Sequence, residues 1–169
     1  MEFWDIYDAE RKMLPRKHRR GMQLARGEFH IVVSVWVYNS KKELLLTKRA
    51  PQKESFPNLW ENTGGSAVSG ETSLQAIARE LREETGIHAG EEEFILLDSS
   101  RERSSFYDTY LLCKDVAIAD TVMQAGETCE ARWVTLAQFK KMLAAGEVAA
   151  PIVRRFGYLE KKIKNAIGF

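Results

Sequence analysis

Two glutamates, Glu83 and Glu84, stand three and four residues after a third, Glu80. On an α-helix this spacing gathers them within roughly 100° of arc, so that their carboxylates share one face. Like charges this close destabilise a helix by roughly 0.2–0.5 kcal/mol per pair, and a bound cation would relieve the repulsion. Because carboxylate oxygens are hard ligands, Mg²⁺ or Mn²⁺ is the expected ion. Mg²⁺ commonly combines protein carboxylates with substrate phosphates, which indicates phosphate chemistry.

Three glutamates alone could equally form a solvated helix face, and the residues around them decide between the two interpretations. Starting at Gly65, the chain reads GSAVSGETSLQAIARELREETGI, with Glu71 six residues on and Arg79 directly before Glu80. At roughly 7% usage per residue type, seven fixed residues and two apolar positions would arise by chance in far fewer than about one in a million such chains. The pattern therefore indicates a functional site.

The segment from residue 65 to residue 87 resembles the Nudix box at every defined position. The sequence is thus similar to Nudix hydrolases, which cleave a nucleoside diphosphate linked to another group with the help of Mg²⁺ or Mn²⁺. The resemblance implies an α/β fold of the Nudix type: an α/β/α sandwich with a central mixed sheet, in which the box forms a loop, a helix and a loop.

The same resemblance implies a role for each fixed residue of the box. A glycine lets the backbone approach a cation closely, and an arginine among glutamates holds one of them in a fixed rotamer. By resemblance, the metal ligands are Gly65, Glu80, Glu83 and Glu84, and the residues that support catalysis by pairing inside the site are Glu71 and Arg79.

Hydrolysis by such a site requires an activated water and a base. Metal ions would bridge phosphate oxygens and lower the pKa of the attacking water, and a carboxylate would take its proton. Within the box, Glu83 and Glu80 are the candidate bases. Outside it, Asp108 and Glu130 are possible bases or additional metal ligands, and the alternative is that each is a surface acid.

A second resemblance lies outside the box, in the segments WDIYD, RKHRRG, EFHIVVSVWVYNSKKELLLTKRA and FPNLWENTGG. These are similar to the Nudix subgroup related to isopentenyl diphosphate isomerase, in which two histidines near the first long strand bind metal. His18 and His30 stand at matching positions, although either could be a packing residue. The isomerase also needs a cysteine, and a histidine two residues later, where this chain has Gly64 and Ser66. The comparison therefore favours a hydrolase over an isomerase.

A third interpretation takes the basic stretch from Arg16 to Arg20 and the basic C-terminal segment as a nucleic-acid surface. The 25 Lys and Arg residues against 24 Asp and Glu give a formal net charge of +1, and no nucleic-acid-binding signature surrounds the basic stretch. We therefore expect a small-molecule diphosphate as the partner instead. In that case Arg19, Arg20 and Arg49 are candidates for binding its phosphates, a task that suits the planar guanidinium group. The oligomeric state stays open.

The composition fits one globular domain. With 169 residues, 44% of them hydrophobic and 29% charged, we expect a single Nudix domain over residues 1–169. Residues 1–28 are expected to form an N-terminal extension with a strand and a basic loop. Cys113 and Cys129 are in no metal-ligand spacing, which favours a reduced, cytoplasmic protein. Because no apolar run approaches roughly 18 residues, no membrane span is expected.

The elements that must position the box are readable from hydrophobic periodicity. Thr72 and Gln75 are spaced as a capping box and Gly86 stands where a helix ends, so we expect a helix over residues 72–85. Leu74, Ile77 and Leu81 form its apolar stripe. The pattern further predicts strands at 3–7, 30–38, 43–48, 94–98, 106–113 and 131–135, the second and third of these as a hairpin, and helices at 136–145 and 152–167.

Overall fold

The computed structural model describes residues 2–169 of the chain. The strands are β1 (Phe3–Tyr7), β2 (Met13–Arg19), β3 (His30–Tyr38), β4 (Leu44–Arg49), β5 (Trp60–Glu61), β6 (Gly64–Ser66), β7 (Ile95–Glu102), β8 (Ser105–Cys113) and β9 (Thr128–Val134). The α-helices are α1 (Ser73–Thr85), α2 (Leu136–Ala144) and α3 (Ala150–Ile167), and short 3₁₀ turns span Glu91–Glu93 and Ile118–Asp120. Within the described residues, no helix is both long and apolar enough to cross a membrane.

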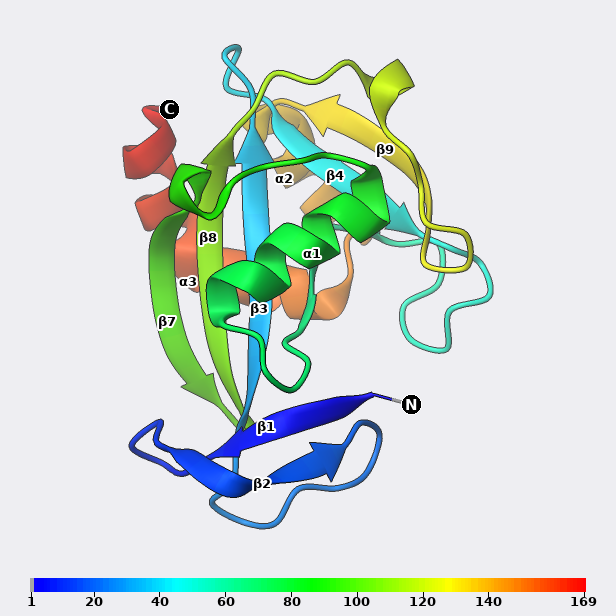
Figure 1. The fold of residues 1–169 in the computed structure, drawn as a ribbon. Coiled ribbons are helices and arrows are strands. Elements are labelled where there is room, and N and C mark those ends of the chain that lie inside the picture. The colour runs from blue at the N-terminus through cyan, green and yellow to red at the C-terminus, as the bar shows by residue number, and fades with distance from the viewer. Residues whose placement is uncertain (1) are drawn as a thin grey trace.

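The central sheet is mixed. Its strands run in the order β5, β4, β3, β8, β7, with β6 also pairing with β3 and β9 with β4. β3 and β8 are parallel, whereas the other pairs are antiparallel. Figure 1 shows α1 across one face of this sheet and α2 and α3 behind the other. The expected α/β/α sandwich with a central mixed sheet is therefore confirmed.

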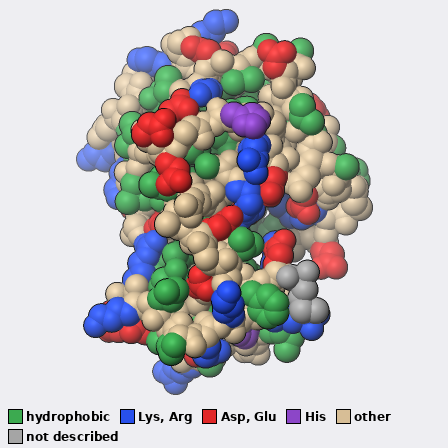
Figure 2. All heavy atoms as spheres, viewed as in Figure 1, with side chains coloured by type: hydrophobic (Ala, Val, Ile, Leu, Met, Phe, Trp, Pro, Cys, Tyr) green, Lys and Arg blue, Asp and Glu red, His purple; other side chains and the backbone are tan. Residues whose placement is uncertain are grey.

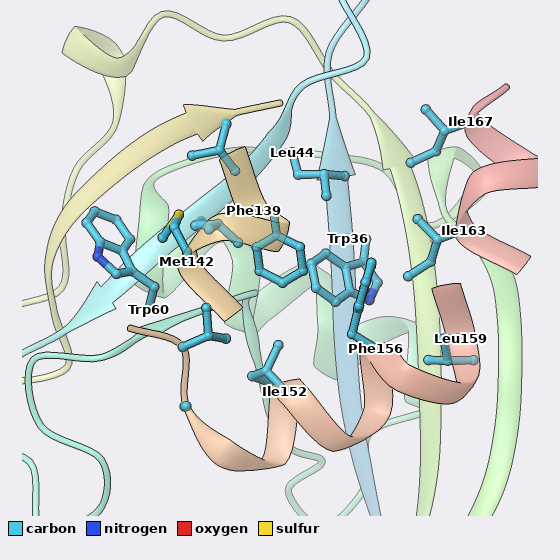
Figure 3. Packing of buried hydrophobic residues seen from close by; sticks show 14 of the residues in the cluster. Trp36, Leu44, Trp60, Phe139, Met142, Ile152, Phe156, Leu159, Ile163 and Ile167 are labelled. Carbon is cyan, nitrogen blue, oxygen red and sulfur yellow. The ribbon is translucent and has the colours of Figure 1, made fainter. Parts of the chain in front are cut away.

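Apolar side chains fill the space on both faces of the sheet. Toward α2 and α3, Trp36 of β3 meets Phe139 and Phe156, with ring centroids 5.4 Å and 5.8 Å away (Figure 3). Toward α1, the predicted stripe is confirmed, because Ile77 and Leu81 are fully buried and Leu74 packs partly buried beside them. Burial of this stripe fixes which face of α1 turns away from the sheet.

The ends of α1 are fixed by the residues that the sequence pattern indicates. The Thr72 hydroxyl accepts a hydrogen bond from the backbone N–H of Gln75 at 3.2 Å, and the Gln75 side chain accepts one from the N–H of Thr72 at 3.0 Å. At the other end, Gly86 has a φ of 73° and donates its N–H to the carbonyl of Arg82. A left-handed residue at this position favours glycine. The predicted helix and both of its caps are confirmed.

One expectation about the strands is wrong, and another is confirmed with less pairing than expected. The basic stretch expected to be a loop is strand β2, which pairs with β1 in a separate two-stranded sheet, the N-terminal hairpin (residues 3–19). The expected hairpin of β3 and β4 is paired only at Tyr38 and Leu44. Beyond that pair the two strands diverge, because the segment from residue 60 to residue 66 takes their facing edges: β5 pairs with β4 and β6 pairs with β3.

Contacts from three places attach the N-terminal hairpin to the sheet. Trp4 stacks on His30 with ring centroids 3.9 Å apart and an interplanar angle of 12°. Tyr7 and Phe29 exchange backbone hydrogen bonds of 2.8 Å and 2.9 Å. Arg11 donates a hydrogen bond of 2.9 Å to Asp108 and forms an ion pair with it. The hairpin therefore lies at one end of the sheet, below α1 in Figure 1.

The His30–Trp4 stack makes stability depend on pH. Burial, followed by the charges of Arg20 and His18, lowers the pKa of His30 from 6.5 to about 4. Unfolded His30 binds a proton below pH 6.5 and folded His30 only below about pH 4, so stability falls as the pH drops through this window, by about 3 kcal/mol in total. We expect His30→Phe, which keeps a stacked ring but binds no proton, to lose less stability between pH 7 and pH 4.5. Urea unfolding at both pH values measures this, and equal losses in both proteins would contradict it.

Candidate active site

Within the segment from residue 65 to residue 87, strand β6 lies close to the glutamates of helix α1. Strand β6 pairs with β3, which places Gly65 opposite Val33, and α1 packs on the same strand. Gly65 and the Glu80 carboxylate lie so close that a Cβ at position 65 would overlap the carboxylate. A glycine at position 65 therefore lets the β6 backbone and the carboxylate meet.

Arg79 lies at the centre of a hydrogen-bond network inside this segment. Its Nε and Nη2 donate to the two carboxylate oxygens of Glu71 at 2.6 Å and 3.0 Å. Its Nη1 donates to Glu80 at 3.0 Å and to Glu83 at 3.1 Å, and Nη2 also reaches the carbonyl oxygen of Ser66 at 3.2 Å. The arginine thus holds three carboxylates and the backbone of β6 in one arrangement.

The three helix glutamates differ in their surroundings. Glu83 is exposed, Glu80 is half-buried, and Glu84 is only 7% exposed. The Oε2 atom of Glu84 is buried with no hydrogen-bond partner in the described part of the chain. Burial, followed by the neighbouring charges of Glu61, Glu80 and Glu127, raises the pKa of Glu84 well above its ordinary value. The backbone N–H of Gly64 opposes this rise only in part. A buried carboxylate oxygen without a partner is costly, and a bound cation would offset that cost.

Two of these neighbours, Glu61 and Glu127, are site residues that sequence reasoning missed. Glu61 lies on β5, where Arg49 donates to both of its oxygens at 2.8 Å and 3.0 Å. Burial raises the pKa of Glu61 although Arg49 opposes this. Glu127 precedes β9 and forms an ion pair with Lys53. An acid directly after Trp60 in a strand is a weak signal for Glu61, whereas nothing in the local sequence marks Glu127.

The predicted phosphate-binding arginines lie at different places around this acidic site. Arg19 and Arg20 are exposed at the end of β2 and line a hollow of about 460 Å³ together with Glu2 and Glu127. Arg20 forms an ion pair with Glu2, and its charge counteracts the rise that burial causes in the pKa of Glu80. Figure 2 shows acidic and basic side chains interleaved over this face of the molecule and a hollow between α1 and the hairpin.

The four candidate residues outside the box have other partners. Asp108 is 2% exposed and accepts hydrogen bonds from Arg11, Ser73 and Ser99. Burial, the largest single influence, raises the pKa of Asp108. The three hydrogen bonds and the charge of Arg11 together outweigh it and hold that pKa below its ordinary value. His30 is stacked on Trp4, and the Nε2 of His18 lies 3.1 Å from the carbonyl oxygen of Met22. Glu130 is exposed on β9, 3.8 Å from Lys48.

The donor set at Gly65, Glu80 and Glu84 fits a hard divalent cation. The oxygens of two carboxylates and of a backbone carbonyl are ligands that Mg²⁺ and Mn²⁺ prefer, and one carboxylate oxygen is buried without a partner. Among residues 2–169, however, no three acidic, histidine or cysteine side chains converge as a metal cluster. Arg79 occupies oxygens of Glu80 and Glu83 in this arrangement, so cation binding would require those side chains to shift.

The site lies on a mixed sheet between helices, where Arg79 pairs with the glutamates of α1 next to strand β6. This loop–helix–loop arrangement is the one expected of a Nudix hydrolase. The NUDIX domain family model matches residues 28–156, and the chain belongs to the Nudix hydrolase family. It is 38% identical over 154 residues to an uncharacterized Nudix hydrolase of Listeria monocytogenes, covering 87% of this chain and 88% of the relative. A crystal structure of a Deinococcus radiodurans protein superposes with a TM-score of 0.73 and 27% identity, over 91% of this chain and 98% of the other.

The chain is also similar to isopentenyl-diphosphate isomerases, over a shorter stretch. The isomerase of Pectobacterium atrosepticum is 43% identical over 63 residues, which cover 37% of this chain and 35% of that enzyme. The chain is thus a Nudix hydrolase with local likeness to the isomerases.

Proposed function

We propose that this protein is a Mg²⁺- or Mn²⁺-dependent hydrolase that cleaves the pyrophosphate bond of a nucleoside diphosphate derivative or a related organic diphosphate. The observation that carries the proposal is the buried Glu84 carboxylate beside Glu80 and Gly65 in a complete Nudix box, because its Oε2 atom has no hydrogen-bond partner among the described residues. The proposal treats residues 1–169 as one Nudix domain that includes the 1–28 extension. The free cysteines Cys113 and Cys129 accord with a cytoplasmic location, which stays a prediction.

In this proposal the metal ligands are Gly65, Glu80, Glu83 and Glu84. The bound ion would supply charge neutralisation at the phosphates and lower the pKa of the attacking water. Glu83 or Glu80 takes the proton from that water. For Glu80, burial raises the pKa toward neutrality, which suits a base, although Arg79 opposes the shift. Glu71 orients Arg79, which in turn orients these glutamates.

Arg20 and Arg49 are proposed to bind the substrate phosphates, with Arg19 beside them. All three carry planar donors close to the acidic site, on the hairpin and on β4. Asp108 and Glu130 are not given roles in the reaction, because the first is held by three side-chain donors and the second faces Lys48. His18 and His30 likewise serve the hairpin in this proposal.

The isomerase alternative is disfavoured because Gly64 and Ser66 stand where that enzyme needs its cysteine and histidine, and neither residue can protonate an alkene. A nucleic-acid-binding role is disfavoured because two residues of the basic stretch have acidic partners. Arg16 pairs with Glu28 and Arg20 with Glu2.

A substrate panel tests the proposed function. Nucleoside di- and triphosphates, nucleotide sugars, dinucleotides and isoprenoid diphosphates are incubated with Mg²⁺, Mn²⁺ or chelator, and released phosphate or nucleotide is measured. We expect metal-dependent release from at least one member and none with chelator. Interconversion of isopentenyl and dimethylallyl diphosphate would support the isomerase alternative instead. Salt-dependent RNA binding without turnover would support the binding alternative.

Replacing Gly65 by Ala tests the contact between β6 and Glu80. The added methyl group would overlap the Glu80 carboxylate, which must therefore move. It can do so because it is the flexible end of its side chain. We expect Mn²⁺ affinity to fall about tenfold, as when the surroundings of metal ligands are changed, while the unfolding midpoint changes little. Gly157→Ala on α3, where a Cβ meets open space, is the matched control and should leave Mn²⁺ affinity unchanged. Equal Mn²⁺ affinity in Gly65→Ala and wild type would contradict the role of Gly65.

A further inference from the structure

Strand β1 of the N-terminal hairpin is bonded directly to the loop that begins the Nudix helix. The backbone N–H of Ser69 donates to the carbonyl oxygen of Phe3 at 2.7 Å. The Asp5 carboxylate accepts two further hydrogen bonds of 2.7 Å, one from the Ser69 hydroxyl and one from the backbone N–H of Gly70. One carboxylate therefore holds two consecutive residues of the loop.

The residues held by Asp5 lie next to the arginine network. Gly70 has a φ of 92°, a left-handed conformation that turns the chain into Glu71. Glu71 accepts the N–H of Val68 at 2.9 Å and binds Arg79 with both oxygens. Asp5 thus fixes the loop on one side, and Glu71 closes it on the other.

The hairpin does not need Asp5 to stay attached to the sheet. The stack of Trp4 on His30, the backbone bonds between Tyr7 and Phe29, and the Arg11–Asp108 ion pair all join the hairpin to β3 or β8. The two bonds of Asp5 are the ones that reach from a hairpin side chain to the box. Their effect must therefore fall mainly on the box.

We propose that Asp5 is a positioning residue of the Nudix site, which holds the 68–71 loop so that Glu71 keeps Arg79 aligned with Glu80 and Glu83. This inference rests on the proposed metal-dependent hydrolysis. It makes the N-terminal hairpin a working part of the site and extends the site beyond the segment that the sequence pattern marks.

The test compares Asp5→Ala and Asp5→Asn with wild type on the best substrate of the panel. We expect kcat to fall about tenfold in Asp5→Ala with KM within about twofold, because Asp5 acts on the glutamates through the loop and Arg79. Mn²⁺ binding, followed by electron paramagnetic resonance, should weaken several-fold, and amide exchange at Gly70 should accelerate. Because Asn keeps one acceptor oxygen, the kcat of Asp5→Asn should lie between those of wild type and Asp5→Ala.

Asp8→Ala is the matched control. Asp8 lies in the same hairpin, and its carboxylate accepts backbone N–H groups of Glu10 and Lys12 without reaching the box. We expect this variant to keep wild-type kcat and Mn²⁺ affinity. If Asp5→Ala also keeps both, or changes only KM or the unfolding midpoint, the proposal is overturned while the proposed function stands. A wild-type protein that neither binds Mn²⁺ nor hydrolyses any diphosphate would overturn both.

Discussion

Replacing Glu84 by Gln is expected to lower metal-dependent turnover by roughly a hundredfold or more. Removing the charge from a metal ligand forfeits several kcal/mol of transition-state stabilisation, and each 1.4 kcal/mol or so is a factor of ten in rate. Without metal, the same variant should be more stable than wild type, because a buried carboxyl group crowded by other glutamates becomes a neutral amide of the same shape. Each kcal/mol gained would raise the melting temperature by about 2–4 °C.

The control for this experiment is Glu160→Gln, which neutralises a partly exposed glutamate of α3 that pairs with Lys140. It should leave both turnover and the melting temperature of the metal-free protein close to wild type. Turnover is measured on the best substrate at saturating metal. Unchanged turnover in Glu84→Gln and in Glu83→Gln would mean that the helix glutamates do not bind the catalytic metal.

Replacing Arg79 by Gln is expected to cost about 3 kcal/mol of stability, the lower end of the range for breaking a largely buried ion pair. The arginine is 20% exposed, and its loss removes the charged donor of Glu71 and Glu80, which are 18% and 13% exposed. Turnover should fall as well, because the glutamates lose their common orientation. Arg79→Lys keeps the charge but cannot reproduce the fork of donors to Glu71, so it should lie between wild type and Arg79→Gln.

A double-mutant cycle separates the ion pair from simple packing. If the cost comes from the uncompensated Glu71 carboxylate, adding Glu71→Gln to Arg79→Gln should restore part of the stability. Urea unfolding midpoints of the four proteins measure the coupling. Additive losses would show that Glu71 and Arg79 stabilise the fold independently of each other.

The helix of the site could be predicted from sequence because its signals are local. Capping residues and apolar spacing together set the ends and the buried face of α1, and the structure follows both. The burial of Glu84 is predictable from the sequence only in part. It stands three residues after Leu81 and seven after Ile77, so it lies on the buried side of the helix, whereas Glu83 turns to solvent.

What could not be predicted depends on contacts between distant segments. The sequence around Asp108 resembles that of an acid available for catalysis, but Arg11 of the hairpin neutralises it. Likewise, Glu61 and Glu127 come together near Glu84 only after β4, β5 and β9 have assembled. The sequence does not indicate strand β2, because its basic residues lack apolar alternation and only pairing with β1 orders them.

The parallel pairing of β3 with β8 has a consequence for how the protein folds. The ladder runs from His30 beside Ser105 to Tyr38 beside Cys113, so α1 and the whole box lie inside the chain loop that it closes. Closing so long a loop is entropically costly and makes such a topology slow to form. Changes that weaken the ladder should therefore retard folding, whereas changes confined to the Arg79 network should mainly hasten unfolding. We accordingly expect the candidate site to be among the last parts of the molecule to form.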